Sequence, residues 1–185
     1  MSTNIVVQNA RLSYVNLFSP RATKDGDPKY STTVLVPKGD TASYQAIRAA
    51  VEEATQYGIG AKWNGKRPPR IDTPIHDGDG TRENGEPFGD ECKGHWLFTA
   101  SSKRQPGVVD QRVQPIMDST QVYSGMYANV AVNFYPYDAG GHRGIAAGLN
   151  HVQKVRDGDS LGGGPSASEV FSVLPDVQGN GSWSL

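Results

Sequence analysis

Residues 127–135 are the part of the sequence that most narrows the fold. Apolar and polar side chains alternate there without a break, and the apolar set is Ala128, Val130, Val132 and Phe134. Strict alternation places one set on each face of a β-strand, whereas a helix would spread both sets around its axis. The pattern therefore predicts a strand with one face in a hydrophobic core.

Further strands are expected at residues 4–13, 30–36, 94–102 and 145–155, where β-branched and aromatic residues lie between turn signals. The chain of 185 residues holds 22 glycines and 12 prolines, which break helices and favour a β protein rich in loops. One domain of this length can bury a core without disulfides.

Only one helix is expected, at about residues 41–57. Asp40 or Thr41 can cap its start, and Gly58 is expected to end it. Apolar residues recur inside it at spacings of three and four, as on a helix face that packs against a core; they are Tyr44, Ile47, Val51 and Ala54.

Two segments carry no expected element. Residues 58–94 are rich in glycine and proline, and a connection this long inside a compact domain is usually functional or disordered. Residues 162–185 begin with a run of glycine, proline and serine and are expected to form a flexible tail. The expected division is therefore a domain at 1–161 followed by a tail at 162–185.

The net charge of −1 conceals an uneven distribution. Residues 72–91 contain seven acids and one base, while bases collect in residues 62–70 and 93–112. A basic body with acidic appendages suits a polyanionic partner, although ordinary solvated charge would look the same.

Aromatic side chains beside these bases indicate what the polyanion is. The polar face of residues 127–135 carries Tyr127 and Tyr135 with two asparagines, and Trp96 precedes the basic pair Lys103 and Arg104. Aromatic rings that stack on bases, next to cations that follow the backbone, are typical of single-strand binding. The alternative is that these rings serve cross-strand pairing or the core.

Catalytic and metal patterns are weak in this sequence. Its single cysteine, Cys92, excludes an internal disulfide and a multi-cysteine zinc site, and the four histidines have no ligand spacing. Asp77, Asp79 and Glu83 could gather a magnesium ion, as a nuclease requires, but they do not follow the calcium-loop pattern. No catalytic residue, metal or cofactor is expected.

Short segments in a fixed order resemble a family of phage single-stranded DNA-binding proteins long catalogued as a domain of unknown function. They span about residues 5–163 and include residues 10–14, 28–31, 63–66, 75–79, 100–103, 106–110, 122–125, 133–135, 144–150 and 152–154. The resemblance implies an OB-fold, a closed antiparallel β-barrel with long inserted loops, and sequence-independent binding of single-stranded DNA without catalysis.

The resemblance also implies a setting. The protein would protect and organise single-stranded DNA during phage replication and recombination, in the cytoplasm of the bacterial host and away from membranes. It would act as a monomer or homodimer, with phage replication or recombination proteins as further partners. Related proteins often end in a strongly acidic tail, whereas residues 165–185 here hold only Glu169 and Asp176.

The resulting hypothesis is a basic groove in which rings stack on bases and cations meet phosphates. Its expected nucleic-acid-binding residues are Lys66, Arg67, Trp96, Lys103, Arg104, Tyr123, Tyr127, Tyr135, Tyr137 and Lys154. A metal-dependent nuclease using the acidic residues 72–91 and a structural virion protein are the alternatives.

Overall fold

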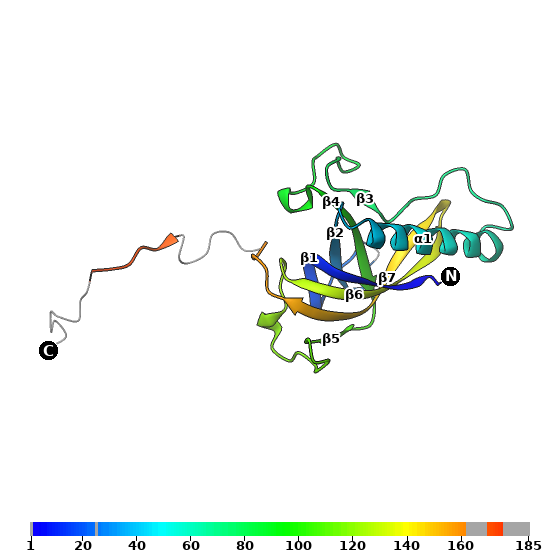
Figure 1. The fold of residues 1–185 in the computed structure, drawn as a ribbon. Helices are drawn as coiled ribbons and strands as arrows, with labels where there is room; N and C mark the ends of the chain where they lie inside the picture. Colours follow the sequence, from blue (N-terminus) through cyan, green and yellow to red (C-terminus); the bar gives the residue numbers. More distant parts are fainter. Residues whose placement is uncertain (1, 25, 162–169, 176–185) are drawn as a thin grey trace.

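The computed structural model describes residues 2–24, 26–161 and 170–175. Figure 1 shows a body of strands with one long helix beside it. The elements in chain order are β1 (Asn4–Arg21), β2 (Lys29–Pro37), α1 (Thr41–Ala61), β3 (His76–Asp77), η1 (Asp90–Cys92), β4 (His95–Ser102), β5 (Gly107–Val109), η2 (Ser119–Gln121), β6 (Tyr127–Ala139) and β7 (His142–Arg156).

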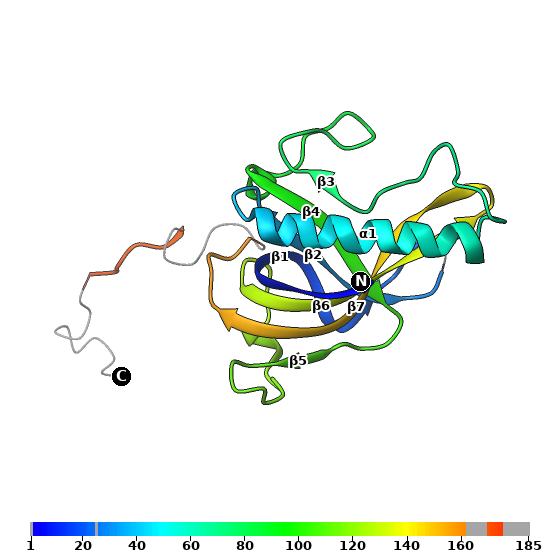
Figure 2. The same cartoon turned by 45° about the vertical axis from the view of Figure 1, so that its right-hand side comes forward.

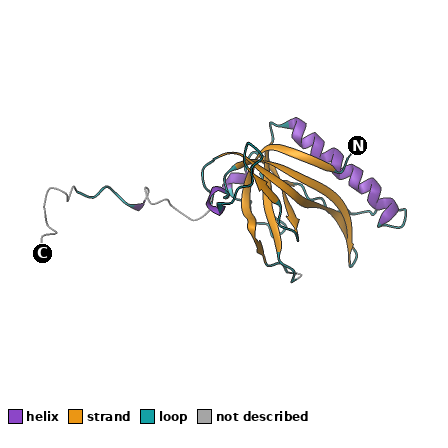
Figure 3. Cartoon of the chain, turned by 90° about the horizontal axis from the view of Figure 1, so that it is seen from below, coloured by secondary structure: helices purple, strands orange, loops and turns teal. Residues whose placement is uncertain are grey.

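Five of these strands close into a barrel in the order β1-β2-β4-β7-β6, with β6 returning to β1. Figure 3 shows the strands curling around one another. Neighbouring strands are antiparallel except β4 and β7, which pair in parallel through Ala100 with Ala147 and Ser101 with Gly148. The predicted mainly β, OB-like barrel is confirmed, and its closing contact is a parallel one.

Strand β1 is longer than the expected 4–13 because it serves two neighbours. Its first part pairs with β6 and its second part with β2. The register shifts between Val7 and Ala10 and again between Ser13 and Asn16, and Asn9 and Tyr14 lie in these gaps with φ of 53° and 48°. Bulges of this kind bend a strand and increase its twist, which lets one strand curve around a barrel.

The apolar face predicted for residues 127–135 does lie inside the barrel. Its four apolar side chains are 0–2% exposed, and the Phe134 ring packs at 5.7 Å from that of Phe98 on β4. Leu12 of β1 and Val34 of β2 complete the centre with no exposed surface. The core is therefore built from the alternate residues of all the neighbouring strands.

Helix α1 packs beside β6 and β1, across the barrel (Figure 2). The Asp40 side chain caps its start by accepting a hydrogen bond from the Ser43 N–H at 3.1 Å. The predicted end at residue 57 was wrong, because the helix continues through Gly58 to Ala61. Gly58 instead allows close packing, since a Cβ there would lie 2.7 Å from Pro136 Cβ and 2.9 Å from the Trp63 ring.

The long connection after the helix contains little regular structure, as expected, apart from β3 and η1. Residues 162–169 and 176–185 of the expected tail lie outside the described residues, so the division at 161/162 stays a prediction. In the described part of the chain, no helix has the length and apolar character needed to cross a membrane.

A pair of glycine substitutions tests the packing of the helix. Gly58→Ala should lower the free energy of unfolding by about 1–3 kcal/mol, because the new methyl group collides with Pro136 and Trp63. Gly60→Ala is the matched control, because nothing lies within 4 Å of its Cβ position, and it should be neutral or slightly stabilising. Urea denaturation of both variants measures the difference, and equal stabilities would contradict this role of Gly58.

Candidate nucleic-acid interface

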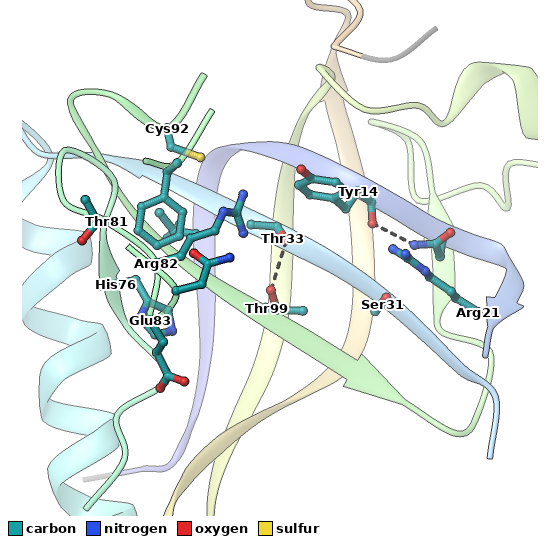
Figure 4. A pocket seen from close by; sticks show the side chains of 14 residues that line it. Tyr14, Arg21, Ser31, Thr33, His76, Thr81, Arg82, Glu83, Cys92 and Thr99 are labelled. Atoms are coloured by element: carbon teal, nitrogen blue, oxygen red, sulfur yellow. Dashed lines mark hydrogen bonds between the residues drawn. The ribbon is translucent and has the colours of Figure 1, made fainter. Parts of the chain in front are cut away.

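A groove of about 790 Å³ crosses the outer surface of β1, β2 and β4. Its floor is made of small hydroxyl side chains, Ser31, Thr33 and Thr99, which point away from the core (Figure 4). The hydroxyl oxygens of Thr33 and Thr99 are 3.1 Å apart and hydrogen-bonded across the two strands. A floor of this kind is neutral and can both donate and accept hydrogen bonds.

Tyr14 stands over one side of the floor, with its ring open to solvent. Its side chain is 54% exposed, and its φ of 48° is rare for a residue other than glycine. The β1 bulge places it there, and the Asn16 amide donates a hydrogen bond of 3.1 Å to its carbonyl oxygen. The face of the Tyr14 ring is therefore available to a planar ligand.

The opposite wall is the segment 78–94, which folds back over the barrel. Phe88 and Cys92 form a small cluster with Leu35 of β2 and Leu97 of β4, which seals this end of the groove. The Arg82 guanidinium carbon lies 4.9 Å from the centre of the Phe88 ring, on the groove side. Arg82 therefore combines a positive charge with a flat surface held by an aromatic ring.

An ion pair outside the groove fixes this wall. Lys38 Nζ, just after β2, lies 2.6 Å from Asp77 Oδ1 and 2.6 Å from Asp79 Oδ2. The other oxygen of Asp79 accepts a hydrogen bond from the Gly94 N–H, so the carboxylate ties both ends of the segment. Hydrogen bonds from the Lys38 ammonium, followed by backbone N–H groups, lower the pKa of both carboxyls, and the carboxylates raise the pKa of Lys38.

Charges in the groove lie at its edges. Arg21 stands at one side and Arg82 at the other, with Glu83 as the acid between the wall and solvent (Figure 4). A strand of nucleic acid has planar bases and a charged backbone, so it needs flat neutral surface and flanking cations. The groove supplies both.

The residues predicted from the sequence lie elsewhere on the barrel, and none lines this groove. Lys66 and Arg67 follow α1, where Arg67 pairs with Glu52 at 3.1 Å. Lys103 and Arg104 follow β4, and Lys103 lies 3.3 Å from Asp27 in the β1–β2 connection. Both basic pairs are exposed, and they belong to separate connections.

The Trp96 ring is engaged within the protein. It stacks on Tyr44 of α1 with ring centres 4.4 Å apart, and Lys38 Nζ lies 4.9 Å from its centre. Trp96 packs against the main core as a partly buried residue, while Phe98 is fully buried. The alternative of a core role therefore describes the position of Trp96, and the nearby Phe98 is a core residue.

The structure brings three predicted residues together near the end of β6. Lys154 Nζ lies 5.3 Å from the Tyr123 ring, and Tyr127 packs under Arg156, whose guanidinium carbon is 3.7 Å from the ring centre. The Tyr123 hydroxyl donates to Asp157 at 2.8 Å, and burial, with that carboxylate, raises the pKa of the phenol.

Tyr135 and Tyr137 lie at the other end of β6. Tyr135 is 40% exposed and faces outward, as the alternation predicted. Tyr137 is partly covered, and its carbonyl accepts a hydrogen bond from Trp63 Nε1 at 3.3 Å. Burial raises the pKa of the Tyr137 phenol. The ten predicted residues therefore do not share one surface.

Sequence reasoning missed Tyr14, Arg21 and Arg82 as site residues. Tyr14 lies one residue beyond the expected strand 4–13, and a bulge leaves no mark in a pattern of alternation. Arg82 is the one base of an acidic stretch, and its place in the sequence does not mark it as a binding residue. For Arg82, the signal in the sequence is a single base among acids.

Comparison with known proteins shows which family the chain belongs to. A family model described as "Enterobacter phage Enc34, ssDNA-binding protein" matches residues 3–180. The chain belongs to this family. The family therefore confirms the resemblance found in the sequence, and its members bind single-stranded DNA rather than catalyse a reaction.

Three relatives show how far the likeness extends. "Putative protein p50" of Acyrthosiphon pisum secondary endosymbiont phage 1 is 34% identical, covering 92% of this chain and 93% of its own. The single-stranded DNA-binding protein from bacteriophage Enc34, solved in complex with ssDNA, has a TM-score of 0.73 at 26% identity, covering 86% of this chain and 90% of that one. The single-stranded DNA-binding protein gp2.5 of bacteriophage T7 shares the fold, with a TM-score of 0.57 at 16% identity, covering 89% and 92%.

Two of the three acids considered for a nuclease are paired with a lysine. Asp77 and Asp79 bind Lys38, and Glu83 stands apart at the groove edge. No group of three or more histidine, cysteine, aspartate or glutamate side chains is arranged to hold a metal ion within the described residues.

The ion pair that holds the wall predicts a pH-dependent effect. Lys38→Met should lower the melting temperature at pH 7, because both carboxylates lose their partner. A lowered pKa stabilises the fold above the ordinary carboxyl value of 3.8 and loses this contribution as the pH falls through the folded value. The difference in melting temperature between wild type and variant should therefore disappear only below about pH 3.8.

Thermal unfolding at a series of pH values measures this gap. Lys93→Met is the matched control, since Lys93 lies 3.5 Å from an almost fully exposed Asp90, and it should melt like the wild type throughout. If the difference in melting temperature stays constant down to pH 2.5, Lys38 acts through its packing on Trp96 instead.

Proposed function

We propose that this protein binds single-stranded DNA in the groove on β1, β2 and β4. The observation that carries the proposal is the exposed Tyr14 ring over a neutral hydroxyl floor, flanked by Arg21 and Arg82. In OB-folds the face of the second and third barrel strands is the usual binding surface for oligonucleotides, and β2 and β4 hold those places here. The Enc34 relative, solved with ssDNA, supports the same ligand.

The shape of the groove favours an unpaired strand. Bases that stack on Tyr14 and contact Thr33 or Thr99 must expose their faces and edges, which a duplex keeps within its stack. The hydroxyl floor can satisfy any base edge because each hydroxyl both donates and accepts, so binding is expected to be independent of sequence.

The biological setting follows the same proposal. A sequence-independent single-strand binder of phage origin would protect and organise DNA in replication and recombination, in the cytoplasm of the bacterial host. Phage replication or recombination proteins are its proposed further partners, and it would act as a monomer or homodimer. The family membership supports this setting.

Substitutions of two tyrosines on different faces test where bases stack. Tyr14→Ala should weaken single-stranded DNA binding by about 5–150-fold, because stacking on an aromatic ring contributes about 1–3 kcal/mol per base. Tyr14→Phe should bind nearly as well as the wild type, since the ring is kept. Fluorescence anisotropy with a labelled oligonucleotide measures affinity, and circular dichroism confirms that each variant is folded.

Tyr135→Ala is the comparison variant, because this ring is similarly exposed but lies on the β6 face proposed from the sequence. If DNA follows the β1–β2–β4 groove, Tyr135→Ala should bind normally. Weak binding by Tyr135→Ala together with normal binding by Tyr14→Ala would move the interface to the β6 face and overturn the proposed groove.

The salt dependence of binding tests the cations at the groove edges. Arg21→Gln and Arg82→Gln should each flatten the plot of log affinity against log salt by roughly 0.7, the amount lost per phosphate contact on a single strand. Lys103→Gln with Arg104→Gln tests the cations predicted from the sequence by the same measurement. If the double substitution of Lys103 and Arg104 changes the salt slope and the single substitutions of Arg21 and Arg82 do not, the DNA backbone runs along the end of β4 instead.

A further inference from the structure

A second groove, of about 370 Å³, lies on the outer face of β1, β6, β7 and β5 and shares no lining residue with the groove proposed for DNA. It includes Asn129 and Ala131 of β6, which lie between Tyr127 and Tyr135 on the outer face of that strand. Its lining has five apolar side chains, Val6, Val109, Val113, Ala131 and Val152, beside Gly107 and three polar side chains, Asn129, His151 and Gln153. No lysine, arginine or acid lines it.

Two valines at its edge are unusually open to solvent. Val6 is 58% exposed and Val113 is 65% exposed, so the groove presents apolar surface that a partner could cover. The proposed DNA groove has cations at its edges, and this one has none. Its chemistry therefore suits an apolar peptide segment better than a nucleic acid.

The backbone at Val113 is held in a costly conformation. Its φ of 62° lies in the left-handed region, which β-branched residues avoid. Asp110 imposes the turn, since its side chain accepts hydrogen bonds from the Arg112 and Gln114 N–H groups and its carbonyl accepts one from Val113. Strain of this kind is concentrated at ligand clamps, which is consistent with a turn built to present Val113.

The chain carries its own apolar segment of suitable size. Residues 170–174 include Val170, Phe171, Val173 and Leu174, whose side chains are 57%, 74%, 98% and 80% exposed. Four apolar residues in five, all open to solvent, form a second surface that burial would stabilise. Neither the groove nor the segment has a lysine, arginine, aspartate or glutamate side chain.

The connection between them is long enough. The chain leaves the barrel near Leu161, whose N–H donates to the Ser124 carbonyl, and Gly158 packs against the Tyr127 ring. Tyr127 and Ala131 are four residues apart on β6, which is about 13 Å. The eight intervening residues 162–169 can span up to about 30 Å.

We propose that residues 170–174 dock into this groove on their own barrel, burying Phe171 and Val173 against Val6 and Val113. Short tethers give effective concentrations in the millimolar range, so a modest apolar contact suffices to hold the segment. The proposal is independent of the proposed function, because the docked segment leaves the β1–β2–β4 groove open.

Disulfide trapping in the full-length chain tests the docking. The double variant Val113→Cys with Val173→Cys should form an intrachain disulfide under mild oxidation, while the native Cys92 stays buried at 3% exposure. Ser119→Cys with Val173→Cys is the matched control, because Ser119 is also exposed but lies outside the groove, and it should react at least tenfold more slowly. Equal rates for the two pairs would overturn the proposal.

Variants on each side of the contact separate docking from chance collision. Phe171→Asp, or Val6→Asp, added to the first pair should slow disulfide formation to the control rate, and both side chains are exposed enough to leave folding intact. An unchanged rate would exclude an apolar contact. Disulfide-linked dimers in place of the intrachain product would assign the groove to a second copy and contradict the proposal.

The last comparison repeats the disulfide measurement in the presence of saturating single-stranded DNA. The rate of the Val113 and Val173 pair should not change, because DNA and the segment use different grooves. Loss of the disulfide on adding DNA would show that both compete for one surface and would overturn the separate docking site. Failure to bind DNA at all would instead count against the proposed function and leave the disulfide result standing.

Discussion

The double pairing of β1 is the constraint on which the rest of the structure depends. A single strand of 18 residues must meet β6 with its first part and β2 with its second, and a regular strand cannot turn that far. Three shifts of register bend it, and the barrel can then close through the parallel contact of β4 with β7. The same bend turns Tyr14 outward, so the irregularity that closes the fold also creates the aromatic surface of the groove.

The acidic stretch contributes to the site as a scaffold. Asp77 and Asp79 hold Lys38, and the segment between them and β4 carries Phe88 and Arg82 to the groove edge. Gly78 lies so close to the Cys92 carbonyl that a side chain there would collide with it. A stretch with a net negative charge thus presents its one base, Arg82, at the groove edge together with Glu83, while Asp77 and Asp79 are paired with Lys38.

The outer surface of β6 has a different character from end to end. Tyr127 is covered by Arg156, Asn129 bonds to Gln153 at 3.0 Å, and Ala131 opens into an apolar groove. Asn129 and Ala131 line the same groove, so the polar face expected from the sequence divides into a covered part at Tyr127 and an open groove beside it. Neighbouring strands, which alternation does not specify, decide what each side chain can do.

The sequence by itself determined the class of fold and the buried face of β6. Alternation at residues 127–135 reports burial directly, because successive side chains on a strand must face opposite ways. It also determined the start of α1, since Asp40 is a cap whose effect is local. The short matched segments further indicated the family, which the comparison confirmed.

Only the tertiary structure decided the end of the helix, the closure of the barrel and the candidate site. Gly58 resembles a helix terminator, but packing against Trp63 and Pro136 overrides its weak local preference. Trp96 resembles a stacking platform, but Tyr44 of the helix already covers it. Long-range strand pairing brings Tyr14, Thr33 and Thr99 together, and the folded-back segment 78–94 adds Arg82. No spacing along the chain records contacts of that kind.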